Sequence, residues 1–160
     1  MNFKILTSYF YQIRFFKPNY IPLSTAVFDP KWYHKNLGNT YQYFDKNNVI
    51  NGLRAEPFVP NKDCEGLCRG PSVCITEDPT TCEFLSTYYK QLKQLNFNSI
   101  MERFSQLAAQ YKVAKNLSND IIFVLIFHET PNNPCSERWI VQKWFKDNGY
   151  IVEEFNKEAI

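Results

Sequence analysis

The chain lacks the short motifs that mark the most familiar enzyme classes. It has no glycine-rich phosphate loop, no G-x-S-x-G nucleophile elbow and no H-E-x-x-H metal-binding helix. Glycine is scarce, with 5 residues in 160, and histidine is scarcer, with 2. The easiest enzyme classes are therefore excluded, and any site has to be built from less stereotyped groups.

Long apolar runs and a strong excess of one charge are also missing. The longest apolar run, Ile121–Phe127, is far shorter than the ~20 residues of a membrane-spanning helix. The start MNFKILTSYF has no small-residue cleavage site and predicts a first strand, not a signal peptide. The net charge of +2 is too even for a general nucleic-acid-binding face, although it leaves room for a local basic pocket. We expect a cytoplasmic protein with no membrane partner.

Aromatic and apolar side chains, in contrast, are abundant. Hydrophobic residues make up 44% of the chain and aromatic residues 17%, enough for a substantial core. The length of 160 residues fits one domain, so we treat residues 1–160 as a single unit. Some of the aromatic side chains are available to line a ligand cleft or to stack on bases.

The hydrophobic pattern predicts alternating strands and helices. Asp120–Phe127 is apolar without alternation, as expected of a central parallel strand that is covered on both faces. The helix that follows should begin at Ser136 as N-cap and stop at Asn148-Gly149. We predict a Rossmann-like three-layer α/β domain with a mostly parallel sheet. Its strands are expected at 3–10, 21–28, 120–127 and 150–155, and its helices near 84–95, 100–111 and 137–147.

Four of the five cysteines are clustered within residues 60–82, a segment rich in glycine and proline. Their spacing is Cys64-x3-Cys68-x5-Cys74-x7-Cys82. In a reducing compartment such a cluster predicts a metal site, and four thiolates suit a closed, structural Zn²⁺ site. An iron–sulfur cluster, a redox-active or disulfide pair, and ordinary free thiols are the alternatives.

Polar side chains follow three of the predicted strands, where ligands bind in open α/β sheets. Glu129 is the candidate proton carrier and Asp29 the second catalytic carboxylate. Ser136 and Arg138 open a helix whose N-terminus favours an anion. The candidate ligand-binding residues are Ser8, Tyr9, Trp32, Tyr33, Cys135, Ser136 and Arg138.

Each of these residues also has an ordinary structural interpretation. Cys135 could be a small packed residue instead of a nucleophile, and Arg138 could pair with Glu137 instead of a ligand. Trp32 and Tyr33 could belong to the core instead of stacking on a base. The two histidines, His34 and His128, are more typical of hydrogen-bonded structural groups than of catalytic ones.

Both ends of the chain resemble a known family. Ile5-Leu6-Thr7-Ser8-Tyr9-Phe10, Pro30-Lys31-Trp32-Tyr33 and Val124–Glu129 with Cys135 are similar to motifs of the phage and bacterial "domain of unknown function 488" family. The resemblance implies a Rossmann-like α/β fold and a role in nucleotide or nucleic-acid metabolism, with no established activity. Phe127 replaces the family's strand-end cysteine, and Cys135-Ser136-Glu137-Arg138 replaces its C-H-R-H run.

Two classes of function remain open from the sequence. The first is an enzyme or binder for a nucleotide-type ligand at the strand ends, with N-glycosidic or base-processing chemistry as the candidate reaction. The second is a non-catalytic phage counter-defence protein that sequesters a nucleotide signal or binds a host protein or DNA. In the latter case Lys62 and Arg69 of the cysteine-rich segment would matter more than Glu129.

Overall fold

A parallel sheet of four strands forms the centre of the molecule. The computed structural model describes residues 1–35, 41–67 and 78–159. The strands are β1 (Phe3–Tyr9), β2 (Tyr20–Ser24), β5 (Ile121–Phe127) and β6 (Glu153–Glu154), in the order β2-β5-β1-β6, and every pairing is parallel. The prediction of a mixed α/β fold with a parallel sheet is confirmed.

Strand β5 occupies an interior position of the sheet, as its unbroken apolar sequence predicted. Phe123 and Leu125 point to one face and belong to the larger core. Val124 and Ile126 point to the opposite face and belong to a second core. All four side chains are fully buried because both faces of the sheet are covered.

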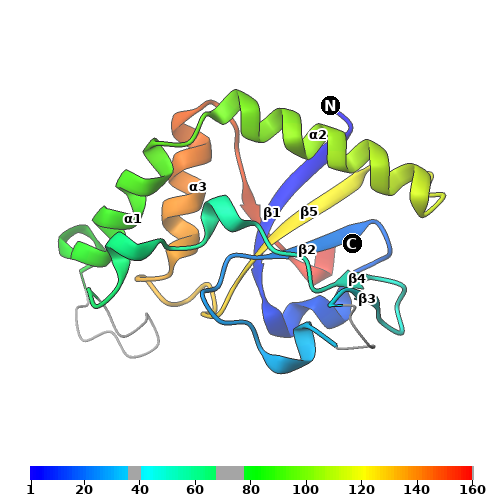
Figure 1. Ribbon diagram of the computed structural model, residues 1–160, viewed down its shortest axis with the longest axis horizontal. Helices are drawn as coiled ribbons and strands as arrows, with labels where there is room; N and C mark the ends of the chain where they lie inside the picture. The colour runs from blue at the N-terminus through cyan, green and yellow to red at the C-terminus, as the bar shows by residue number, and fades with distance from the viewer. Residues whose placement is uncertain (36–40, 68–77, 160) are drawn as a thin grey trace.

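Three helices cover the first face: α1 (Glu83–Lys93), α2 (Phe97–Ala114) and α3 (Glu137–Asp147). Figure 1 shows α1 beside α3 at one end of the sheet, while α2 runs across the strands. Ser136 caps α3, since its side chain accepts a hydrogen bond from the Arg138 amide. The chain leaves α3 through Gly149, whose φ of 83° suits glycine.

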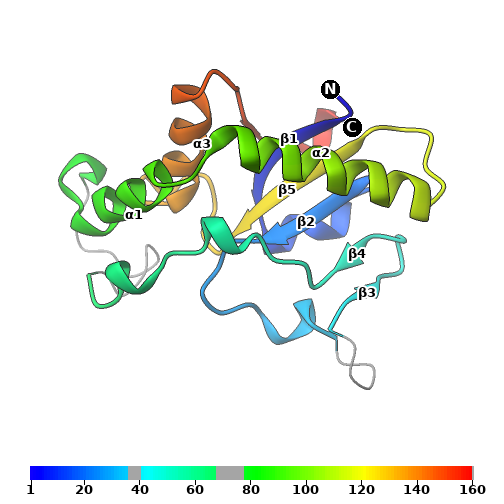
Figure 2. The same ribbon diagram turned by 45° about the horizontal axis from the view of Figure 1, so that its top comes forward.

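The second face carries no α-helix in the described part of the chain. It is covered by the 3₁₀ segments η1 (Phe10–Phe15) and η2 (Lys31–Tyr33) and by a small hairpin. The hairpin is formed by β3 (Tyr43–Phe44) and β4 (Ile50–Asn51), and Figure 2 shows it on the side of the sheet away from α2. The Phe10–Asn19 connection is too short for a crossover helix with its two loops, and it folds into η1.

Some predicted elements are shorter in the structure. Strand β2 ends at Ser24 and not at Phe28, and the amide and hydroxyl of Thr25 both donate to the Ile126 carbonyl at the end of the ladder. Strand β6 keeps only two residues of the predicted 150–155. No helix among the described residues has both the length and the apolar character required to cross a membrane.

Candidate functional site

The carboxyl ends of β1, β2 and β5 lie side by side, because β5 pairs with both of the other strands. The three groups of polar residues predicted from the sequence therefore do meet at one edge of the sheet. Their side chains divide between two buried networks, one centred on Arg138 and one on Asp29.

Arg138 is completely buried, and all five of its N–H donors are used within the protein. Its Nε and one Nη2 hydrogen contact the Glu154 carboxylate at 2.8 and 3.2 Å. The other bonds reach the carbonyls of Ser8 and Glu129 and the hydroxyl of Ser136, at 3.0, 2.6 and 3.0 Å. Arg138 thus joins the ends of β1 and β5 to β6, and no donor remains for a ligand in this arrangement.

Two further carboxyl groups, those of Glu129 and Glu137, interact electrostatically near the start of α3. Glu129 is partly buried and accepts a hydrogen bond from the Ser136 hydroxyl at 2.9 Å. Burial, and then the negative charge of Glu129, raise the pKa of Glu137 to about 8. The assignment of Glu129 as a proton carrier stays a prediction.

Asp29 forms the second network. Its side chain is 3% exposed and contacts the Ser24 hydroxyl, His34 Nε2 and Arg54 Nη1, the last at 2.7 Å. Burial alone would raise the pKa of Asp29, but these three hydrogen bonds and the Arg54 charge outweigh it and lower that pKa. Asp29 is therefore an ionised carboxylate that orients its neighbours.

The two aromatic candidates after β2 have different environments. Tyr33 is fully buried, and its hydroxyl bonds the carbonyls of Pro22 and Leu53. It is a core residue that links β2 to the 53–55 segment. Trp32 is 49% exposed, so its ring is open to a stacking partner.

The remaining candidates at the strand ends are largely enclosed. Ser8 and Ser136 are fully buried, and Cys135 is 4% exposed. The partly buried Tyr9 accepts a hydrogen bond from Gln12 at 2.7 Å. This edge is thus well packed, and the open surface lies beside it.

The structure describes two of the four predicted metal-binding cysteines, Cys64 and Cys82. Cys68 and Cys74 lie outside the described residues. Cys64 is buried against α1, where its Sγ contacts the Gln91 side chain and burial raises the pKa of the thiol, and Cys82 is the N-cap residue at the other end of that helix. No group of three or more metal-binding side chains occurs among the described residues, which include only two of the four cysteines.

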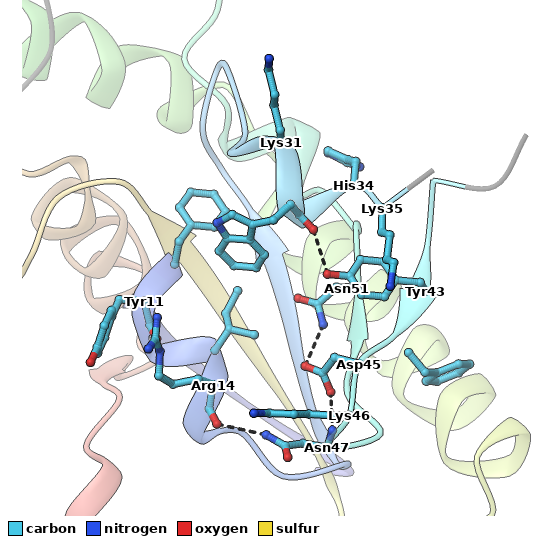
Figure 3. A pocket seen from close by; sticks show the side chains of 14 residues that line it. Tyr11, Arg14, Lys31, His34, Lys35, Tyr43, Asp45, Lys46, Asn47 and Asn51 are labelled. Carbon is cyan, nitrogen blue, oxygen red and sulfur yellow. Dashed lines mark hydrogen bonds between the residues drawn. The ribbon is translucent and has the colours of Figure 1, made fainter. Parts of the chain in front are cut away.

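A cleft of about 950 Å³ opens between η1, η2 and the β3–β4 hairpin (Figure 3). It begins where β1 and β2 end and extends along the second face of the sheet. Aromatic and basic side chains from all three segments surround it. The lining includes Tyr11, Arg14, Lys31, Trp32, His34, Lys35, Tyr43, Phe44, Asp45, Lys46 and Asn51.

The cleft concentrates positive charge that the whole chain does not show. Its lining contains Arg14, Lys31, Lys35 and Lys46 but only one carboxylate, Asp45. No ion pair joins any of the four cations to a carboxylate of residues 1–35, 41–67 or 78–159. Unpaired cations around an open cleft attract anions.

Exposed aromatic rings stand beside these cations. Tyr11 on η1 and Phe44 on β3 are 53% and 55% exposed. The Arg14 guanidinium lies 3.6 Å from the centre of the Tyr11 ring. Such pairs offer a flat apolar face and a positive charge to the same ligand.

Polar contacts fix the hairpin against the rest of the cleft. The Tyr43 hydroxyl donates to the Trp32 carbonyl at 2.8 Å, and the side-chain amide of Asn47 donates to the Arg14 carbonyl at 3.1 Å. The Asp45 carboxylate organises the turn by accepting hydrogen bonds from the backbone amides of Asn47 and Val49. The cleft is therefore preformed by hydrogen bonds between its three walls.

Of the residues that line this cleft, Trp32 was a ligand-binding candidate from the sequence, and His34 was expected to be a structural group. Arg14, Tyr43, Lys46 and Asn51 fall in segments whose pattern predicts only turns and short strands. A charged residue in a loop has no periodic signal, so its position depends on how the loop folds. The three aromatic residues Tyr41, Tyr43 and Phe44, followed by Lys46, were the available hint.

Comparisons with known proteins do not identify a relative. No protein-family model matches the chain, and neither curated proteins nor solved structures show a significant match. The resemblance to the domain of unknown function 488 family thus remains an expectation from the residues at the two ends of the chain.

Proposed function

We propose that the protein binds a nucleotide-type ligand in the cleft between η1, η2 and the β3–β4 hairpin. The observation that carries this proposal is that one open cleft combines exposed aromatic rings with four cations that form no ion pair within the described part of the chain. A base would stack on Trp32, and the phosphate would lie among Arg14 and Lys46. The site differs from the predicted Ser136–Arg138 anion site, whose arginine is committed to the protein's own carboxylate and carbonyls.

Two physical arguments support a ligand with both a ring and a charge. Aromatic platforms contribute about 1–3 kcal/mol for each stacked base. Cations that are not neutralised within the protein gain charge-assisted hydrogen bonds only when an anion arrives. Neither inorganic phosphate nor an uncharged nucleoside would use both features.

Calorimetric titration with the four ribonucleoside monophosphates tests the proposal. We expect at least one of them to bind, and to bind more tightly than adenosine or inorganic phosphate alone. Trp32→Ala should weaken binding about tenfold or more through lost stacking. Lys46→Gln should weaken it roughly 3–10-fold through a lost charged contact.

Lys146→Gln is the matched control, because Lys146 is an exposed lysine of α3 that does not line the cleft. The Lys146→Gln variant should bind the monophosphates with the same affinity as the unmodified protein. The proposal is wrong if no monophosphate binds at millimolar concentration, or if the Lys146 and Lys46 variants lose the same affinity.

We also propose that Cys64, Cys68, Cys74 and Cys82 hold one structural Zn²⁺ ion. The four thiolates are the donor set that closed zinc sites use. Cys64 and Cys82 lie at the two ends of the segment that contains the other two cysteines, and both pack with the helix-covered core. In this role the ion would fix the segment to α1 and leave the cleft free for the ligand.

A further inference from the structure

Three buried side-chain atoms in the described chain have no hydrogen-bond partner: Ser8 Oγ, His34 Nδ1 and Asn51 Oδ1. Two of the three, those of His34 and Asn51, belong to residues that line the proposed nucleotide cleft. Buried polar atoms are nearly always paired, because an unpaired one loses its bonds to water without compensation. Both residues border the same cleft, so a ligand that enters it and opens the packing over these atoms is the candidate for the missing partner.

The orientation of the Asn51 side chain is fixed by its amide nitrogen. Nδ2 donates to Asp45 Oδ2 at 3.2 Å and to the Val49 carbonyl at 3.1 Å, which uses both of its hydrogens. A flipped amide would bring its oxygen against these two acceptors, so the observed orientation is the stable one. Figure 3 shows the Asn51 side chain on the hairpin wall, with its nitrogen bonded to Asp45. The amide oxygen is left as an acceptor without a donor.

His34, at the end of η2, offers the same kind of atom. Its Nε2 contacts the ionised Asp29 carboxylate and therefore carries the hydrogen. In the tautomer with its hydrogen on Nε2, Nδ1 carries the lone pair and is an acceptor. The histidine cannot turn without breaking its contact with Asp29, so this atom is also held in place.

We propose that the cleft recognises a nucleobase that carries an exocyclic amino group, such as adenine or cytosine. The amino group would donate to Asn51 Oδ1, with His34 Nδ1 as a second acceptor within the same cleft. This inference rests on the proposed function and adds the ligand's chemical class to it. A base or an anion without N–H donors would leave both buried acceptors unpaired.

A deletion on the ligand tests the inference without disturbing the protein. Adenosine monophosphate is compared by calorimetry with purine riboside monophosphate, which lacks only the amino group. Cytidine monophosphate is compared in the same way with its 4-deamino analogue. We expect at least one of the analogues to bind about tenfold or more weakly than its parent, the effect of leaving a buried acceptor unpaired.

Asn51→Val supplies the matched protein change. In this variant the ratio between the affinities of parent and analogue should fall toward one, while the stacked ring and the phosphate still bind. If the variant fails to fold, which circular dichroism would show, the ligand comparison on the unmodified protein decides alone.

The possible outcomes separate this inference from the proposed function. Equal affinity for parent and analogue in both pairs would overturn the role of the amino group and leave nucleotide binding intact. If the analogue binds more weakly than its parent by the same factor in Asn51→Val as in the unmodified protein, the role of Asn51 is overturned. Absence of any nucleotide binding would overturn both proposals.

Discussion

At the scale of single residues, the protein places ionisable groups in its interior and satisfies them there. Arg138 was a candidate for ligand binding because an arginine at a helix start suits an anion. In the structure its charge is matched by Glu154 at 2.8 Å, and its remaining donors hold two backbone carbonyls and the Ser136 hydroxyl. A fully buried arginine has to be paired in this way, since a lone buried charge is very unfavourable.

Glu137 gives a pH-dependent prediction at this scale. Its pKa of about 8 in the folded protein, raised by burial and by Glu129, exceeds the ordinary unfolded value of about 4.3. The folded state therefore holds a proton that the unfolded state releases between these values, so the free energy of unfolding falls as pH rises through that window. Glu137→Gln should remove this fall and be more stable than the unmodified protein at pH 8, by on the order of 2 kcal/mol.

Urea denaturation at pH 5 and pH 8 measures this difference. Glu102→Gln, which changes an exposed carboxyl of α2, serves as the control and should leave the pH dependence as it is. Parallel stability profiles for Glu137→Gln and the unmodified protein would show that Glu137 is ionised in the folded state at neutral pH.

At the scale of elements, the β3–β4 hairpin decides whether the cleft exists. It supplies one wall, and Lys115 fastens it by donating to the carbonyls of Pro18 and Asn48 at 2.6 and 2.8 Å. Leu53 and Ala55, just beyond the hairpin, bond the backbone of Ser24 at the end of β2. The hairpin is therefore held at both ends although each of its strands has only two residues.

Gly52 is the residue on which the closure of this hairpin depends. Its φ is 94°, and a Cβ at this position would lie 2.2 Å from the Tyr41 carbonyl oxygen. Gly52→Ala should therefore force apart the two arms of the hairpin at its open end, lower the free energy of unfolding by roughly 2–4 kcal/mol and abolish binding in the cleft. Urea denaturation and nucleotide titration measure the two effects.

Gly149→Ala separates the clash from the backbone preference. Gly149 has a similar φ of 83°, but nothing lies within 4 Å of its added Cβ. This variant should lose only about 1 kcal/mol and keep ligand binding. If the Gly52 and Gly149 variants behave alike, the Tyr41 contact does not hold the hairpin.

At the scale of the whole molecule, charge is unevenly distributed. The chain has a net charge of +2, yet the lining of one cleft has four cations against one carboxylate. The cysteine-rich segment lies apart from that cleft in the chain and joins the helix-covered core through Cys64 and Cys82. Ligand binding and metal binding are thus expected to be independent of each other.

Elemental analysis of protein purified without added metal or chelator tests the metal proposal. We expect one zinc per chain, no visible absorption band, and a lower melting temperature after the zinc is removed, because the metal supplies ordering free energy to the segment. Cys74→Ser should lose the zinc, whereas Cys135→Ser, which changes the cysteine outside the cluster, should keep it. Iron with a visible band, or no metal at all, would contradict the zinc assignment.

The sequence by itself determined the strands and helices with strong hydrophobic patterns. The unbroken apolar run of β5 specified an interior strand, and Ser136 specified the start of α3, because burial and capping act over neighbouring residues. The class of fold followed from the order of these elements. These features depend on contacts between residues close in the chain or on simple burial.

Only the tertiary structure decided which polar residues are buried and which face a ligand. Trp32 and Tyr33 are adjacent in the chain, yet one ring is 49% exposed and the other fully buried. Arg138 pairs with Glu154, which lies on another strand. Arg14 and Lys46 line the same cleft although no local sequence pattern predicts it. The reason is that pairing and exposure depend on groups brought together by folding from separate parts of the chain, and no local spacing encodes them.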